Sequence, residues 1–255
     1  MAQRSLCLFV FFIASISPLA AQAPAAPKEP PPLWDLQVGG SFVGTSGNSD
    51  TASTGADFAA HRRGAVWKIE SSAVAVRVQD HDKRTAERYL GMLRGQRQLS
   101  TILSLTSGLK LERDRFAGID FRSIVDGGLG WALVRQPMWT LDGVTGIAWS
   151  HEAPVAGIGR DAPVGLLQLL SRIPFGAAGN TTQRFTYYPD FARRSAYRSE
   201  AELAAQAAMN SRLALKLGYL LRYSNEPVVG FKKTDNTTTA SVVLRWKASV
   251  PAPAP

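Results

Sequence analysis

Residues 101–112 read TILSLTSGLKLE and alternate between apolar and polar side chains with a period of two. Leucine stands at positions 103, 105, 109 and 111, and the opposite parity is polar except at Ile102. Successive side chains of a β-strand point to opposite faces, so the pattern predicts a strand with one apolar and one polar face. The polar face carries Ser104, Thr106, Lys110 and Glu112.

The same alternation recurs along the chain, most clearly over residues 121–133, 213–223 and 240–246. Turn-forming residues separate these stretches and divide the chain into about 12 strands, most of them ~9 to 15 residues long. Strands of globular proteins average ~5–6 residues, whereas strands that cross a membrane need ~9–11. The strands are therefore longer than those of an ordinary β-sandwich.

Residues 200–222 admit two interpretations. The first half is rich in alanine and other good helix formers, which favours a helix. Alternation from Leu213 onward and the turn-like pair Asn210 and Ser211 favour two strands joined by a hairpin. Both interpretations stay open at this point.

The composition excludes several classes of protein. The 255 residues carry a formal net charge of +9, and only 19% of them are charged, against about 25% in soluble domains. The apolar content excludes disorder for most of the chain, and the single cysteine, Cys7, excludes a disulfide scaffold. Beyond the first segment no uncharged apolar run approaches the ~20 residues of a membrane helix.

The N-terminal segment has the layout of a secretory signal peptide. A basic start, the apolar run 6–19 and small residues up to Ala23 predict cleavage near Ala21, a retained membrane anchor being the alternative. We therefore expect a signal peptide over 1–21, a proline-rich periplasmic linker over 22–33 and a disordered tail over 248–255. The remaining segment, 34–247, is expected to be a single domain.

An exported chain of long alternating strands predicts an all-β fold, an antiparallel transmembrane up-and-down β-barrel in the outer membrane. The apolar parity would face lipid and the polar parity the lumen. Expected partners are outer-membrane lipid, lipopolysaccharide and the barrel-assembly machinery. Nucleic acid is a poor explanation for the positive charge outside the cytoplasm, and we expect no cofactor and no metal.

Tryptophans are expected to form an aromatic girdle where the wall meets the periplasmic interface. If odd-numbered strands run outward, five of the six fall near that interface, and Trp149 falls at the outer end of its strand. The five girdle residues are Trp34, Trp67, Trp131, Trp139 and Trp246.

Five motifs resemble one family: residues 44–51 (GTSGNSDT), 87–89 (ERY), 112–120 (ERDRFAGID), 127–131 (GGLGW) and 232–235 (KKTD). It is the domain-of-unknown-function family that includes the salt-induced outer-membrane protein of Gram-negative bacteria.

This resemblance extends from Trp34 to Trp246 and implies an outer-membrane barrel without a settled activity. One departure concerns the last strand, because barrels of this class usually end on its aromatic residue. Here residues 247–255 follow Trp246, so that assembly signal would be internal.

The polar parity carries charges of both signs, which predicts a narrow or occluded lumen with salt bridges inside it. Arg198, Arg212, Glu112 and Asp120 belong to this inward set. The charges chosen as lumen-facing candidates are Lys110, Arg122, Asp126, Glu200, Glu202, Lys216, Arg222 and Arg245.

Charges of alternating sign over 112–120 suggest an ordered, self-paired loop, with Phe116 as its anchor. The candidate residues of this loop motif are Glu112, Arg113, Asp114, Phe116, Gly118 and Asp120.

Two clusters could carry chemistry. Ser150, His151 and Glu152 contain a nucleophile and a base, but neighbouring strand residues point to opposite faces. Residues 80–82 (DHD) could activate water or hold a cation, although a solvated turn explains them better.

The sequence thus favours a non-enzymatic outer-membrane barrel. It would be either a narrow pore that passes small ions or solutes, or a structural or stress-related component of the envelope. The alternative hypotheses are an outer-membrane hydrolase acting on lipid or surface substrates, and a soluble periplasmic β-protein.

Overall fold

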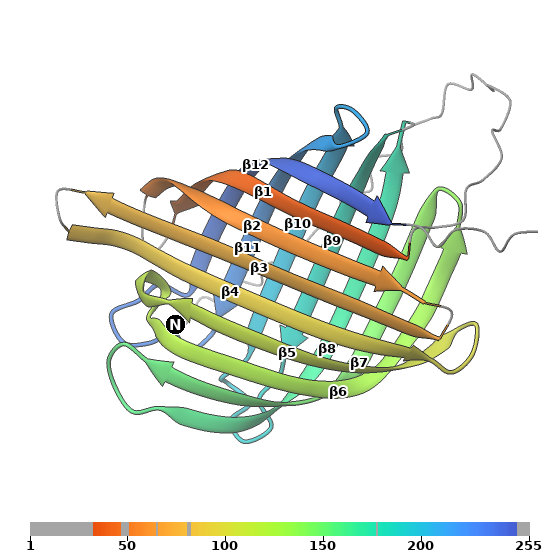
Figure 1. The fold of residues 1–255 in the computed structure, drawn as a ribbon. Helices are drawn as coiled ribbons and strands as arrows, with labels where there is room; N and C mark the ends of the chain where they lie inside the picture. The colour runs from red at the N-terminus through yellow and green to blue at the C-terminus, as the bar shows by residue number, and fades with distance from the viewer. Residues whose placement is uncertain (1–32, 47–50, 65, 81–82, 177, 249–255) are drawn as a thin grey trace, which may run out of the picture. The chain divides into compact units, whose positions relative to one another are not determined.

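The computed structural model describes residues 33–46, 51–64, 66–80, 83–176 and 178–248. Its strands form one closed antiparallel sheet in which each strand pairs with its neighbours in chain order and β1 pairs with β12 (Figure 1). This confirms the predicted up-and-down barrel of about 12 strands. The strands are β1 (Trp34–Ser46), β2 (Thr51–Arg63), β3 (Trp67–Asp80), β4 (Lys83–Gln98), β5 (Leu103–Asp114), β6 (Ile119–Gln136), β7 (Trp139–Pro154), β8 (Arg160–Phe175), β9 (Gly179–Tyr188), β10 (Arg198–Ala208), β11 (Leu213–Ser224) and β12 (Thr234–Ala248).

The seam between the first and last strands closes the wall. It runs without a register shift from the pair Trp34 and Ala248 to the pair Ser46 and Asn236. We call the end where β1 begins and β12 ends the N-terminal rim, and the opposite end the distal rim. Because β1 also pairs with β2 along its length, its backbone N–H and C=O groups have partners on both sides and the sheet has no free edge.

Four strands are longer than the sequence predicts. β4, β7 and β8 have 16 residues each, and β6 has 18. The ladder between β7 and β8 continues through charged residues at the distal rim, where Glu152 pairs with Arg160. An inward charged side chain in such a strand meets opposite charges inside the barrel, so it does not end the strand.

The ambiguous segment after residue 198 forms strands, so the hairpin interpretation is confirmed and the helical one is wrong. β10 pairs with β9 on one side and with β11 on the other. In the connecting turn the Asn210 carboxamide oxygen accepts hydrogen bonds from the backbone N–H groups of Arg212 (2.9 Å) and Leu213 (2.8 Å). Pairing on both sides overrides the helical propensity of the alanines.

The two faces of the wall differ as the alternation predicts. Outward side chains are apolar and exposed, including Val125 (56%), Ile147 (69%) and Leu217 (51%). Inward neighbours such as Thr106 and Asp126 are buried despite being polar. Among the described residues, no helix has the length and apolar character needed to cross a membrane.

β6 and β7 approach each other closely where Gly128 pairs with Gly146. A Cβ atom on Gly128 would lie 2.2 Å from the carbonyl oxygen of Thr145, and one on Gly146 would lie 2.4 Å from that of Gly127. Backbone atoms cannot rotate away as a side chain can, so this close approach of the two strands requires glycine on both.

Replacing Gly128 by Ala should lower the free energy of unfolding by about 1–3 kcal/mol, because the methyl group forces the two strands apart. The adjacent Gly127 is the matched control, since a Cβ there meets no atom within 4 Å. Urea unfolding in lipid vesicles, followed by tryptophan fluorescence, measures both variants. Equal losses for the two would show that Gly128 is not needed for the close approach of the two strands.

Candidate functional site: a charged network across the lumen

Glu112 on β5 lies at the centre of the charged residues inside the barrel, and its side chain is only 1% exposed. Arg222 on β11 donates to its Oε1 atom at 2.7 Å, and Arg122 on β6 donates to Oε2 at 3.4 Å. Arg88 on β4 approaches Oε1 at 3.9 Å. One carboxylate therefore attracts guanidinium groups from three strands.

The contact between Arg222 and β5 crosses the lumen. The Nη2 atom of Arg222 also donates to Asp114 Oδ2 at 2.7 Å. In the closed order of twelve strands, β5 and β11 are six steps apart in either direction and hence face each other. Lys110 on β5 makes a second such contact, with Glu200 on β10, five steps away.

These contacts narrow the barrel between β5 and β11. Twelve strands at a tilt of ~40° give a circular barrel roughly 24 Å across. With bonds of ~1.3–1.5 Å, an extended arginine, an aspartate and a hydrogen bond span at most roughly 14 Å between Cα atoms. The wall at Arg222 and Asp114 is therefore closer to its opposite side than in a circular barrel.

A second carboxylate extends the network toward β7. Glu152 accepts from Arg122 Nε at 2.9 Å and from Arg198 Nη1 at 2.8 Å. Arg198 on β10 also donates to the Ser150 hydroxyl at 3.1 Å and lies over the ring of Tyr188. The network thus joins strands β4, β5, β6, β7, β10 and β11 near the distal rim.

The lumen is crossed again near the N-terminal rim. Arg172 on β8 lies 3.5 Å from Glu70 on β3 and 3.3 Å from Asp142 on the neighbouring β7. β8 and β3 are five steps apart in the strand order. Ion pairs therefore span the interior at two levels.

Apolar side chains fill the inner face of β6 to β9 beside the charged network. They form one buried cluster in which Leu166 is fully buried and Tyr188 borders Arg198. The members are Ile124, Ala148, Ala162, Val164, Leu166 and Tyr188, with Val144 packed against them. Together with the ion pairs, this cluster occupies much of the interior.

The structure does not bring all eight lumen-facing candidates together. Lys110, Glu200, Arg122 and Arg222 belong to the charged network. The other four lie at inward positions elsewhere. Asp126 pairs with Arg94 at 2.8 Å, Glu202 with Arg184 at 3.1 Å and Arg245 with Asp35 at 3.8 Å, while Lys216 lies on β11 beside Ser241 of β12.

The loop motif is mostly not a loop. Glu112, Arg113 and Asp114 end β5, and only residues 115–118 connect it to β6, as a short 3-10 turn closed by Gly118 at φ 81°. Glu112 and Asp114 keep the inward parity, which explains their burial.

Asp120 departs from the inward parity that the sequence assigns to it. A register shift between Ile119 and Phe121 places it beside Arg113 (3.4 Å) and Arg115 (2.9 Å). Phe116 is half-buried in the connection. Arg212, also assigned to the inward set, lies in the turn before β11.

The five girdle tryptophans lie toward the N-terminal rim at outward positions, between 38% and 50% exposed. Trp34 and Trp67 pack beneath the guanidinium groups of Arg62 and Arg97, at 6.0 Å and 5.8 Å from the ring centroids. Trp149 lies in the distal half of β7, as expected from its place in the sequence.

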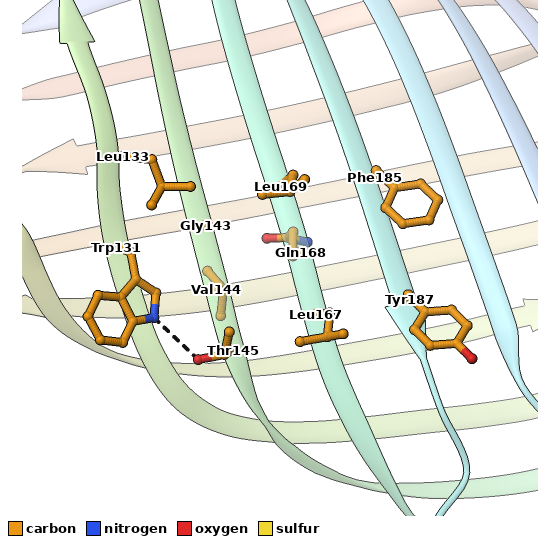
Figure 2. Close-up of a pocket in the computed structure, with 10 residues that line it drawn as sticks. All are labelled: Trp131, Leu133, Gly143, Val144, Thr145, Leu167, Gln168, Leu169, Phe185 and Tyr187. Carbon is orange, nitrogen blue, oxygen red and sulfur yellow. Dashed lines mark hydrogen bonds between the residues drawn. The ribbon is translucent and has the colours of Figure 1, made fainter. Parts of the chain in front are cut away.

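A groove of about 690 Å³ lies on the outward face of β6 to β9 (Figure 2). Leu133 and Leu169 flank Gly143, Phe185 lies farther along the groove on β9, and Trp131 Nε1 donates to Thr145 Oγ1 at 3.3 Å. Its apolar lining matches a wall that faces acyl chains.

The structure divides the first of the two clusters considered for chemistry between the two faces of the wall. Ser150 points inward to Arg198, whereas His151 points outward, with Nδ1 2.8 Å from Asp161 Oδ1. Of the motif at 80–82, His81 and Asp82 lie outside the described residues, as do the predicted signal peptide and most of the linker and tail. In the described part, no three His, Cys, Asp or Glu side chains are grouped to hold a metal ion.

Arg88 and Arg94 on β4 were not among the predicted inward charges, and Glu152 was considered only with Ser150 and His151 as a candidate for chemistry. Extending the alternation back from Gln96 through residues 94, 92 and 90 would have placed both arginines on the inward parity. No sequence signal identifies their partners, because these depend on which strands face each other across the lumen.

Comparison with protein families gives one match that covers most of the chain. The family described as "Protein of unknown function, DUF481" matches residues 38–246. No curated protein matches the sequence.

Among solved structures, the NanC porin is similar, with a TM-score of 0.56 at 11% identity over 83% of this chain and all of that one. The translocator domain of the autotransporter NalP from Neisseria meningitidis gives a TM-score of 0.48 at 11% identity, over 84% of this chain and 88% of that one. The similarity to the NanC porin shows the fold of this chain and nothing of its function.

Replacing Arg222 by Met should lower the free energy of unfolding by about 3–5 kcal/mol, because Glu112 and Asp114 stay buried without their shortest contacts. Arg184→Met is the control, since its partner Glu202 is 38% exposed and the loss there should be about 1 kcal/mol or less. Urea unfolding in vesicles measures both. Similar small losses would show that the cross-lumen contacts do not stabilise the barrel.

Proposed function

Because the chain belongs to the DUF481 family, whose description assigns no activity, we propose its function from the lumen. The protein is an integral outer-membrane barrel that forms a narrow channel for small ions and solutes and is closed by side chains in this conformation. It has no enzymatic role in this proposal.

The observation that carries the proposal is that ion pairs bridge strands that face each other across the lumen. Arg222 reaches Glu112 and Asp114 across the lumen, and Arg172 reaches Glu70. Replacing buried ion pairs by well-packed apolar side chains is often neutral or stabilising, so stability alone does not favour them. Charged bridges exchange partners with passing ions and water, which apolar packing does not.

The membrane location is supported by the outward face. Apolar side chains cover it, tryptophans gather toward the N-terminal rim, and the sheet has no free edge. Export by a signal peptide cleaved near Ala21, folding by the barrel-assembly machinery and contact with lipopolysaccharide complete the proposal. The described similarity of fold to a porin supports a barrel through which solutes pass.

A structural envelope protein is the second candidate. The buried cluster around Leu166 favours it, because a permanently filled half-lumen stiffens the wall and conducts nothing. A stress-related role would fit either candidate.

Planar bilayer recordings separate the two. Purified wild-type protein should give small conductance steps, and Arg172→Gln should give larger or longer ones, because it removes the bridge between β8 and β3. Heat-denatured protein is the control for contaminating channels. A folded barrel that shows no steps in either form would exclude the channel and leave the structural role.

Membrane fractionation tests the location. We expect the protein in the outer-membrane fraction after carbonate extraction, with faster gel migration before heating than after it, because a closed barrel stays compact in detergent. Release by carbonate would instead show a soluble periplasmic protein.

A further inference from the structure

We propose that the arginines around Glu112 form a binding site for a small oxyanion, a carboxylate or a phosphate, and that Glu112 occupies this site in the closed barrel. This inference rests on the proposed channel function, because it names a ligand that would bind in the lumen. Binding itself can be measured without conduction.

The position of the Glu112 carboxylate defines the site. Its oxygens receive Arg222 Nη1 at 2.7 Å and Arg122 Nη1 at 3.4 Å, and Arg88 Nη2 lies at 3.9 Å. Guanidinium groups recognise carboxylates and phosphates through planar pairs of N–H donors. The three arginines therefore surround a carboxylate of this chain as they would surround that of a ligand.

The contacts of Glu112 leave donors unused. The buried Nε atoms of Arg88 and Arg222 have no hydrogen-bond partner. With the described residues, Arg88 makes only long contacts, 3.6 Å to Asp114 and 3.9 Å to Glu112. A free carboxylate or phosphate, which can orient itself, satisfies more of these donors than a side chain fixed to β5.

Displacement links binding to opening. An oxyanion that takes over Arg222 and Arg122 releases Glu112, and the contact between β5 and β11 then depends on Asp114 alone. The arginine side chains remain 12% to 14% exposed, so an ion in the lumen reaches them. The bound anion would thus weaken the bridge between β5 and β11 that narrows the lumen.

Isothermal titration of the full-length protein in detergent tests the site. Sodium phosphate and sodium acetate are titrated separately, each against sodium chloride at equal ionic strength. Glu112→Gln removes the internal competitor and should bind phosphate at least fivefold more tightly than wild type. Tighter phosphate than acetate binding assigns the site to phosphates, and the reverse order assigns it to carboxylates.

Matched variants make the result specific. Asp161→Asn removes a carboxylate from the outward face of the wall and should leave binding at the wild-type value. Adding Arg88→Gln to Glu112→Gln should abolish the gain. If Glu112→Gln does not give a heat-modifiable band, Arg88→Gln and Arg122→Gln in the otherwise wild-type chain should each weaken phosphate binding at least fivefold.

Unchanged affinity for both phosphate and acetate in folded Glu112→Gln, or full binding of the preferred anion without Arg88, would overturn the proposal. Bilayer recording keeps the two proposals apart. Phosphate binding without conductance would retain the site and exclude the channel, whereas conductance in a barrel that binds neither anion would retain the channel and exclude the site.

Discussion

The structure depends on the requirement that every backbone N–H and C=O inside a membrane be paired within the protein. The seam of β1 with β12 meets it by leaving the sheet without an edge. In the proposed membrane location, closure turns one face of each strand toward lipid and keeps the other face away from lipid. The inward parity can therefore carry arginine, lysine and carboxylates, which an outward position at the same depth could not hold.

The barrel fold and the two faces of its strands could be predicted from the sequence. Leu103 to Leu111 and Leu213 to Tyr223 have the predicted faces because period two is a local property. The predicted inward residues Lys110 and Arg222 lie inside for the same reason. The partners of these two residues could not be predicted from local pattern. Glu200 lies 90 positions from Lys110, and Glu112 lies 110 positions from Arg222. Each pair meets only because the barrel is closed and narrow. The predicted inward position of Asp120 was wrong because the register shift beside it changes the parity of the strand. The helical interpretation of β10 was wrong because helix propensity takes no account of pairing with β9 and β11.

The interior is divided between two kinds of packing. Around Leu166 the inner wall packs as a small apolar core, which has one well-defined arrangement. Around Glu112 several arginines compete for a few oxygens at distances from 2.7 to 3.9 Å. The first region resists rearrangement and the second has alternative pairings close by, so any opening of the lumen would begin on the β5 and β11 side.

The seam also sets the order in which the barrel can be made. Every other pairing joins consecutive strands, but β1 must find β12, about 200 residues later in the chain. Loop closure over such a distance is slow, and until β12 exists the sheet has two open edges. A sheet that has acquired eleven of its strands thus still has two unpaired edges, as a sheet of six strands has. The wall becomes free of edges only when the fifteen residues of β12 take their place between β11 and β1.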